Sequence, residues 1–275
     1  RFLVPEIAVG RRRVAGDISP SPIQAAADLF GTSSEEVRAG ALTEDEFLRS
    51  ESSMIRSRGH CNTMGTASTM AVMAEALGMT LPGIAGTPAP DSRLLEQAHA
   101  TGWLAVQLVA DDRRPSQVMT RASFLNAIVA LAAFGGSSNA VVHLLAIAGR
   151  LGVDLTLDDV DRAGSGVPLL VDLQPAGTFL MEDLHRAGGV LAVLAQVRDL
   201  LDPEAITVTG ASLVSHLDGA DTWDAAVIRP RAEPLIADAG IAVLRGSLAP
   251  DGAVLKIAAA SPHLLEHRGR AVVSD

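Results

Sequence analysis

The sequence predicts an α/β N-terminal domain followed by the start of a β-barrel C-terminal domain. Over residues 1–205, apolar residues recur at helical spacing in several segments that open on capping residues, with apolar runs of strand type between them. From residue 206 onward, short β-type runs are separated by Gly, Pro and Asp turns, which is typical of a small β domain or of the opening strands of a barrel. We therefore expect a boundary near 203–206 and a second domain over 206–275 that ends before a barrel could close.

The composition favours a soluble, cytoplasmic protein that binds neither nucleic acid nor membrane. Hydrophobic residues make up 48% of the 275 residues, and the formal net charge is -10, whereas a nucleic-acid surface needs a basic face. The single cysteine excludes an intramolecular disulfide and indicates a reducing compartment. The start does not resemble a signal peptide, and the apolar stretch 124–134 falls short of the roughly 18 residues that a membrane span needs. Because the chain begins with Arg1 rather than Met, we expect a piece of a longer protein or a processed product.

Capping patterns place the first helices. Ser33-x-x-Glu36 and Thr43-x-x-Glu46 are capping boxes, in which a hydroxyl and a carboxylate satisfy backbone N–H groups, and each is predicted to open a short helix. From residue 66 to 78, Ala, Met, Val and Leu recur at helical spacing and predict a further helix. The Gly- and Pro-rich stretch 81–90 then predicts a loop.

Cys61 lies where a loop turns into the helix that begins near Thr66. The unpaired N–H groups and the dipole at a helix N-terminus favour an anion, so a thiolate at Cys61 would form more easily than in free cysteine. That chemistry suits a nucleophile or a metal ligand. The alternative is a small buried thiol that packs as a hydrophobe.

The middle of the chain predicts two more helices. Residues 91–101 have a helical pattern that we expect to end near Gly102, and residues 103–109 then form either a buried strand or a continuation of the helical layer. The run 122–134 predicts an apolar helix.

A cluster of glycines and hydroxyls, GGSSN at 135–139, follows that helix and precedes another. Exposed backbone N–H groups and hydroxyls at a helix start can hold a carboxylate or a phosphate. The alternative is an ordinary glycine turn with a serine N-cap. His143 lies four residues after Asn139 on the same helix face, where a lone histidine is more often a hydrogen-bonded core residue than a ligand.

The remaining stretch predicts a mixture of elements. Thr156-x-x-Asp159 is a third capping box, and we attribute the acids at 158, 159 and 161 to the helix dipole rather than to a metal site. Residues 167–177 are predicted to form a strand and turn, and 179–189 a turn and a helix start. The predicted β-type runs of the final part are Ile206–Thr209, Ala226–Ile228, Ile241–Leu244 and Ala253–Ile257.

Three acidic or basic side chains in 179–189 could contact a substrate, namely Glu182, Asp183 and His185. Helix capping and surface solvation explain them equally well.

The segment GHCNTMGTASTM at 59–70 resembles the signature of the dihydroxy-acid and sugar-acid (aldonate) dehydratase family, which are iron–sulfur hydro-lyases. PSQVMTRASFLNA at 115–127 and GGSSN at 135–139 also resemble family segments. GIAVLRGSLAPDGAVLK at 240–256 resembles the start of the family's C-terminal barrel domain. The resemblance covers nearly the whole chain, but the family extends well beyond both ends, so the chain looks like an internal fragment.

The resemblance implies a [2Fe-2S] cluster and Mg²⁺ as cofactors, with Cys61 as one of three cysteine ligands of the cluster. The other two cysteines, the metal-binding acids and the serine base of the family have no match here, so no catalytic residue is expected within this stretch. A single thiolate cannot hold such a cluster, and we expect the 275 residues alone to be inactive. Less specific candidates, which could line the substrate pocket, are Thr63, Ser137, Ser138, Asn139 and His143.

Family chemistry implies dehydration of a 2,3-dihydroxy carboxylic acid to a 2-keto-3-deoxy acid, by a homodimer or homotetramer acting on a small hydroxy acid. The sequences around Cys61 and at 174–177 lean towards aldonic acids over the branched-chain dihydroxy acid of amino-acid biosynthesis. Two readings from other classes stay open. One is a cysteine-nucleophile enzyme with Cys61 activated by His60 or His143, and the other is an inactive truncated paralogue or scaffold without a cluster.

Overall fold

The computed structural model describes residues 36–54, 58–238, 241–266 and 268–269, which belong to two compact units, 1–56 and 57–275. The first unit contains α2 (Glu44–Met54). The Thr43 N–H donates to Glu46 Oε2 over 3.0 Å, and the Glu46 N–H donates to Thr43 Oγ1 over 3.3 Å. This confirms the predicted capping box, and the bonds from Thr43 lower the pKa of Glu46. The other box begins at Ser33, which lies outside the described residues.

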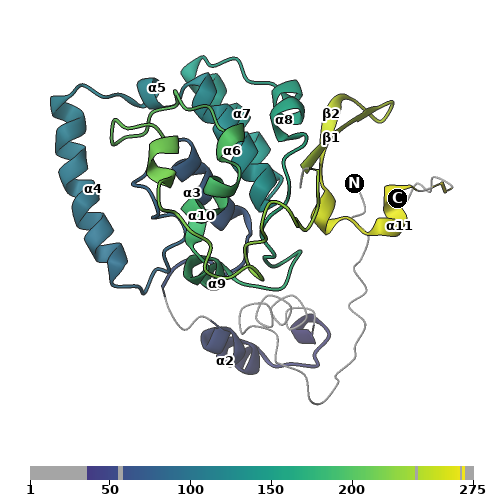
Figure 1. Cartoon of the computed structure of the whole chain (residues 1–275). Helices are drawn as coiled ribbons and strands as arrows, with labels where there is room; N and C mark the ends of the chain where they lie inside the picture. The colour runs from purple at the N-terminus through teal and green to yellow at the C-terminus, as the bar shows by residue number, and fades with distance from the viewer. Residues whose placement is uncertain (1–35, 55–57, 239–240, 267, 270–275) are drawn as a thin grey trace. The chain divides into compact units, whose positions relative to one another are not determined.

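The second unit is built around α6 (Arg121–Phe134), which is buried from Ser123 onward except at Leu125. The sequence of α6 is apolar on nearly all sides, and such a helix is stable only inside a protein. It therefore takes the central place, which confirms the predicted apolar helix (Figure 1). The helices packed against α6 are α3 (Thr66–Ala76), α7 (Asn139–Leu151), α8 (Leu157–Gly164) and α10 (Gly189–Gln196).

Short elements complete the second unit. They are α5 (Pro115–Val118), α9 (Met181–Arg186), α11 (Pro262–Leu265), η1 (Arg198–Leu200), η2 (Val214–Leu217) and η3 (Ile257–Ala259).

The long helix α4 (Arg93–Ala110) corrects two sequence-based expectations. The helix does not end near Gly102 but runs through it, and residues 103–109 are helical and mostly exposed rather than a buried strand. A glycine inside a helix costs only about 1 kcal/mol, which neighbouring i,i+4 bonds can offset. Such bonds flank Gly102: Thr101 Oγ1 donates to the Gln97 carbonyl over 2.7 Å, and Trp103 Nε1 donates to His99 Nε2 over 3.1 Å.

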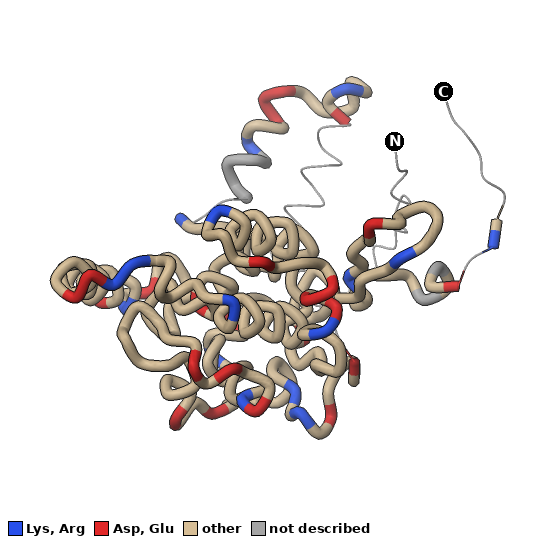
Figure 2. The backbone as a smooth tube through the Cα atoms, turned by 90° about the horizontal axis from the view of Figure 1, so that it is seen from above, with Lys and Arg blue, Asp and Glu red and all other residues tan. Residues whose placement is uncertain are grey.

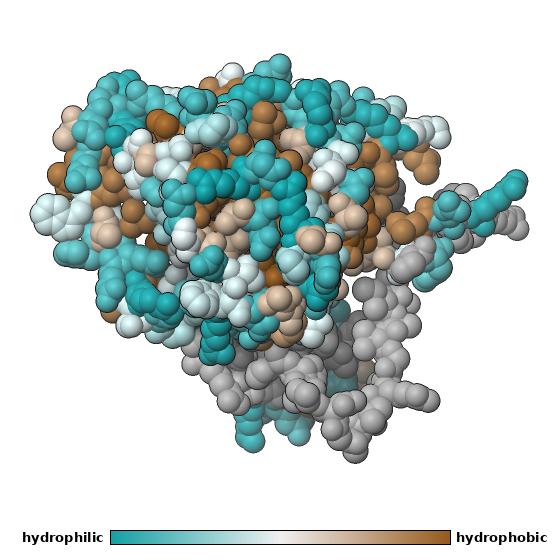
Figure 3. All heavy atoms as spheres, viewed as in Figure 1, coloured by the Kyte–Doolittle hydropathy of each residue, from teal (hydrophilic) through white to brown (hydrophobic). Residues whose placement is uncertain are grey.

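No residue of α4 is buried, and its exposed side includes large apolar side chains. Figure 3, drawn in the view of Figure 1, shows hydrophobic atoms on the side of the molecule where α4 lies. The exposed large apolar residues of α4 are Leu95, Trp103, Val106 and Val109.

Strands β1 (Ile241–Gly246) and β2 (Ala249–Lys256) form an antiparallel hairpin in which Ile241 lies opposite Lys256. This confirms the strands predicted at 241–244 and 253–257. The hairpin lies against α8, where Arg245 pairs with Asp158. Among the described residues this is the one sheet, so the structure shows mixed helices with a small antiparallel sheet.

The prediction of strands at 206–209 and 226–228 is wrong, because each of these segments makes only one isolated β-bridge. Ile206 bridges Ser212, and Ile228 bridges Val171 within the segment 167–177, which likewise forms no strand. Parts of these apolar runs are buried, but their backbone is irregular and no neighbouring strand in the described part of the chain pairs with them. Their sequences therefore resemble those of buried strands although no strand forms. The division of the chain at 205/206 stays a prediction.

Charged residues of both signs are interspersed along the described chain (Figure 2). Among the described residues, no helix is both long enough and apolar enough to span a membrane.

Alanine substitutions at two glycines are expected to change the free energy of unfolding in opposite directions. A Cβ on Gly136 would lie 2.7 Å from Thr69 Cγ2 and 2.8 Å from Leu131 Cδ1, whereas a Cβ on Gly149, inside α7, would meet nothing within 4 Å. We expect Gly136→Ala to lower the free energy of unfolding by about 1–3 kcal/mol through overpacking, and Gly149→Ala to raise it by about 0.5–1 kcal/mol. Urea unfolding of both variants measures the two shifts, and shifts of the same sign would contradict this packing.

Candidate functional site: the Cys61 segment

Cys61 lies in the loop that leads into α3, and its side chain is exposed. The helix begins at Thr66, with Gly65 as the residue before it. The sulfur lies 3.5 Å from Thr63 Oγ1 and 3.7 Å from the position that a Cβ on Gly65 would take. The alternative of a buried, packing thiol is therefore wrong, and the sulfur is accessible to a ligand.

Backbone contacts fix the residues that follow Cys61. The Asn62 carbonyl accepts the Met181 N–H over 2.9 Å, and Asn62 Oδ1 accepts the Glu182 N–H over 3.0 Å. Asn62 thus caps the first turn of α9, although it is distant in sequence. The Met64 N–H donates to the Gln174 carbonyl over 2.7 Å, next to a cis peptide bond at Pro175. The loop that carries the sulfur is consequently held against α9 and the 172–180 segment.

Removing the Asn62 side chain should weaken this attachment. We expect Asn62→Ala to lower the free energy of unfolding by about 1 kcal/mol, since the Glu182 N–H loses its capping acceptor. Thermal unfolding measures the loss. Ser138→Ala is the matched control, because Ser138 makes no side-chain bond to the helix that it precedes, and equal effects of the two variants would contradict the capping role.

A second cluster joins the starts of α3 and α7. Thr66 Oγ1 lies 3.0 Å from Ser137 Oγ and accepts the Asn139 side-chain amide over 2.9 Å. Thr69 Oγ1 accepts the Ser137 N–H over 3.0 Å. The candidate residues Ser137 and Asn139 are therefore brought to the helix that follows Cys61.

The other candidate residues are placed differently. Thr63 lies beside the sulfur, and Ser138 precedes α7. His143 is exposed on α7, so the alternative of a hydrogen-bonded core histidine is wrong. The roles of all five candidates as substrate contacts stay predictions.

The expected oxyanion cradle at 135–139 is largely occupied by the protein itself. The N–H groups of Gly135 and Gly136 donate to carbonyls of α6. The Ser137 N–H donates to Thr69, and the Asn139 N–H donates to Ser137 Oγ over 3.3 Å. Gly135 adopts the left-handed conformation, which turns the N–H groups of Gly135 and Gly136 back onto the end of α6, so of the two alternatives the one that needs free N–H groups at these glycines is wrong.

The geometry gives no support to a histidine that activates Cys61. His60 Nδ1 lies 2.8 Å from the Cys61 carbonyl and 3.4 Å from Ser68 Oγ, so its ring is bonded to groups other than the sulfur. Among the contacts of the described residues, the one polar partner of the sulfur is Thr63.

The acidic residues near the third capping box have structural partners. Thr156 and Asp159 form the predicted box, and Asp159 also accepts Arg121 Nη2 over 2.5 Å. Burial opposes the ionisation of Asp159, but the bonds from Arg121 and Thr156 outweigh it and lower its pKa. This confirms the capping box at Asp159, while Asp158 pairs with Arg245.

Capping and ion pairing also account for two of the acids in α9. Asp183 accepts the Leu180 N–H over 2.9 Å, and Glu182 pairs with Arg186. His185 contacts Arg93. Throughout the described residues, no group of three His, Cys, Asp or Glu side chains is arranged to hold a metal ion.

Sequence reasoning missed the residues that position the candidates. Asn62, Thr66 and Thr69 all bond to segments more than sixty residues away. No local sequence pattern marks such contacts. The one signal that could have identified these three residues is that they lie close to Cys61 in the sequence.

Comparison with known proteins identifies the relatives of the chain. Residues 4–216 match the family described as dihydroxy-acid/6-phosphogluconate dehydratase N-terminal, and residues 226–275 match the corresponding C-terminal family. The chain is 55% identical over 244 residues to an L-arabinonate dehydratase of Rhizobium leguminosarum, with 88% of the chain and 42% of the relative covered.

Two further relatives are similar over most of the chain. A D-xylonate dehydratase of Caulobacter vibrioides is 46% identical, with 82% of the chain and 38% of the relative covered. A dihydroxy-acid dehydratase of Clavibacter michiganensis is 45% identical, with 80% of the chain and 40% of the relative covered. The chain thus spans about two fifths of the length of these curated relatives. Since its sequence matches both family regions over most of its length, the chain belongs to the dihydroxy-acid/6-phosphogluconate dehydratase family.

Proposed function

We propose that the intact protein dehydrates a sugar acid to a 2-keto-3-deoxy acid and that Cys61 is one ligand of a [2Fe-2S] cluster. The observation that carries this proposal is the exposed sulfur of Cys61, on a loop fixed on its C-terminal side by Asn62 and Met64, in a chain related to dehydratases. An accessible thiol on a fixed loop suits a cluster ligand, because iron–sulfur clusters are held by cysteine thiolates at set positions.

The described residues fit only a part of such a cofactor site. Cys61 supplies one sulfur, and no second cysteine exists in the sequence. In the described ranges, no group of three or more His, Cys, Asp or Glu side chains is arranged to hold a metal ion. The remaining ligands would therefore have to come from elsewhere in the intact protein. When bound, the cluster and Mg²⁺ would supply Lewis-acid chemistry that assists departure of a hydroxyl group.

The proposed role of this chain's own residues is to present the thiol and shape its surroundings. Thr63 lies beside the sulfur and can donate a hydrogen bond to a thiolate. The hydroxyl and amide cluster of Thr66, Ser137 and Asn139 lies at the start of the next helix, where it can bond to the hydroxyls of a substrate.

The relatives favour a sugar acid as substrate. The chain is 55% and 54% identical to proteins named for L-arabinonate or L-arabonate, and 45% identical to the Clavibacter relative named for a dihydroxy acid. The branched-chain dihydroxy acid is the alternative substrate within the same chemistry.

The test uses the natural full-length gene product, purified without oxygen. We expect bound iron and sulfide, visible charge-transfer bands, and 2-keto acid formation from L-arabinonate or D-xylonate that exceeds formation from 2,3-dihydroxyisovalerate. A protein that folds but contains no iron would support the inactive scaffold and overturn the proposal. Preference for dihydroxyisovalerate would retain the chemistry but reverse the assigned substrate.

We also propose a cytoplasmic homo-oligomer, which is supported by the lone cysteine and by the exposed apolar side chains of α4. Val106 and Val109 are 68% and 83% exposed, a costly arrangement for apolar residues unless another surface covers them. We expect the double change Val106→Glu and Val109→Glu to lower the oligomeric state measured by light scattering. The matched control is Arg150→Glu at an exposed position of α7, and an unchanged mass in the α4 variant would contradict self-association through α4.

A further inference from the structure

Glu75 places a carboxyl group in the interior of the second unit. The residue lies on α3 and is 1% exposed. The Gly83 N–H donates to Glu75 Oε1 over 2.6 Å, and the Ala85 N–H donates to Oε2 over 2.8 Å. Each carboxylate oxygen therefore accepts a backbone N–H from the loop 79–90, and hydrogen bonds to an ionised acceptor are the stronger kind.

The contacts of Glu75 are with backbone rather than with an opposite charge. The rest of α3, the loop 79–90 and α10 carry no ionisable side chain. On the segments beside the C-terminal end of α3, His216 bonds to Thr209 Oγ1 over 2.9 Å and Arg113 bonds to the Val208 carbonyl over 2.7 Å. On the helices packed against α3, Arg121 is paired with Asp159, and His143 and Arg150 are exposed. Apart from the Met79 N–H, which donates to the Ala74 carbonyl over 2.9 Å, the N–H groups of the loop that bond to α3 donate to the two oxygens of this one side chain.

The same loop reaches the residues that precede Cys61. Arg58 Nε donates to the Ala89 carbonyl over 3.3 Å. A Cβ on Gly59 would lie 2.8 Å from Ala89 Cβ, so the backbone there approaches the loop closely. Movement of Ala89 would consequently displace the turn that leads into Cys61.

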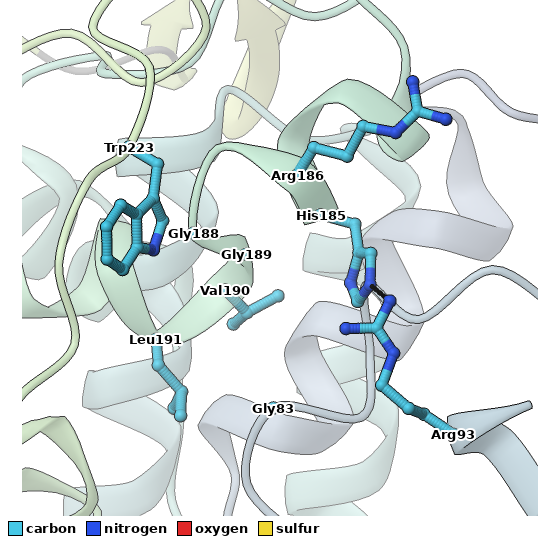
Figure 4. A pocket seen from close by; sticks show the side chains of 9 residues that line it. All are labelled: Gly83, Arg93, His185, Arg186, Gly188, Gly189, Val190, Leu191 and Trp223. Carbon is cyan, nitrogen blue, oxygen red and sulfur yellow. Dashed lines mark hydrogen bonds between the residues drawn. The ribbon is translucent and has the colours of Figure 1, made fainter. Parts of the chain in front are cut away.

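The end of the loop also reaches the helix that holds the residue after Cys61. Asp91 accepts Arg93 Nε over 2.9 Å, and Arg93 Nη2 lies 2.7 Å from His185 Nε2 on α9. Burial and the neighbouring Arg93 lower the pKa of His185, which favours the neutral ring that can accept this bond. Figure 4 shows the Arg93 and His185 side chains next to each other and directed towards each other, and both line a pocket of about 440 Å³ that Gly83 also lines. Since Asn62 caps the start of α9, the loop is connected to both flanks of Cys61.

We propose that Glu75 is a positioning residue for Cys61, acting by holding the loop 79–90 against α3. Its importance for catalysis rests on the proposed function, because the sulfur that it positions is the proposed cluster ligand. Replacing the carboxylate by an amide leaves one acceptor for two N–H donors, so Glu75→Gln should release one of the two bonds without changing the size of the side chain.

The experiment measures the alkylation rate of Cys61 by iodoacetamide at about pH 8, together with amide hydrogen exchange, in this chain. Cys61 is the only cysteine, so the alkylation readout is specific. In Glu75→Gln we expect protection at Gly83 and Ala85 to fall about tenfold, as for loss of a hydrogen bond to a charged group, and alkylation to accelerate severalfold. Ile128→Val in the core of α6 is the control for general loss of stability, and it should change neither readout comparably.

Loss of protection at 83–85 without any change at 58–62 or in alkylation would overturn the proposal. If Glu75→Gln does not fold, the wild type is compared at about pH 5.5 and about pH 8.5, on either side of the value of about 7 to which burial raises the pKa of Glu75. Because the pKa of Glu75 is raised while the loop is closed, ionisation favours opening, so protection at Gly83 and Ala85, corrected for intrinsic exchange, should be lower at the upper pH. Equal protection would overturn the proposal. Iron content of the full-length protein tests the proposed function separately, so either idea can fail while the other survives.

Discussion

If the proposed function holds, replacing Cys61 by serine is expected to abolish iron binding and to lower the proposed dehydratase activity of the intact protein by at least about 100-fold. Loss of groups that merely support a metal ligand already costs 10–100-fold, and here the ligand itself is lost. A serine hydroxyl has nearly the shape of the thiol but does not ionise near neutral pH, so it cannot replace a thiolate on iron. The iron and sulfide content and the visible spectrum of the protein purified without oxygen measure the effect.

The fold itself should tolerate this change. Cys61 is exposed and its sulfur has one weak polar contact, so the free energy of unfolding should change by less than about 0.5 kcal/mol. Thr63→Ala is the matched variant, because it removes the neighbour of the sulfur and keeps the ligand. We expect it to retain iron and to lose about 10-fold in activity as a supporting group. Full iron content in Cys61→Ser would refute the assignment of Cys61 as a ligand.

The second large effect is a dependence of stability on pH that comes from Glu75. Burial raises the pKa of Glu75 to about 7, against the opposing effect of the backbone N–H groups that it accepts. The folded protein therefore binds this proton more tightly than the unfolded chain, in which the pKa is near the ordinary value of 4.5. The stabilisation is fully present below pH 4.5 and is lost as the pH rises through about 7, and the total change is about 3 kcal/mol.

Glu75→Gln removes this titration. We expect the difference in unfolding free energy, wild type minus Glu75→Gln, to decrease by about 3 kcal/mol between about pH 4.5 and about pH 8. Urea unfolding across this range measures the difference, and the other titrating groups, including His185 and His216, are common to both proteins. Glu96→Gln on exposed α4 is the control and should show a constant difference. A constant difference for Glu75→Gln as well would show that Glu75 does not titrate between these limits.

Local sequence patterns predicted the elements whose contacts are local. The capping boxes at Thr43 and Thr156 formed as predicted, because each joins residues three apart. The helix predicted at 122–134 formed as α6, and the strands predicted at 241–244 and 253–257 lie in the β1–β2 hairpin except for Ile257, since apolar periodicity reports burial and a short turn brings its own strands together. The failure at Gly102 has the same origin: a glycine signals a break locally, but bonds on either side kept α4 continuous.

The sequence by itself determined the family resemblance and the identity of Cys61 as the residue to explain. Only the tertiary structure decided that the sulfur is exposed, that the N–H groups at 135–137 are already bonded, and that Glu75 holds a loop connected to both flanks of Cys61. The physical reason is that periodicity and capping record interactions between residues a few positions apart. A buried carboxyl or a loop finds its partners through packing across the whole unit, and that packing leaves no mark at any one position of the chain.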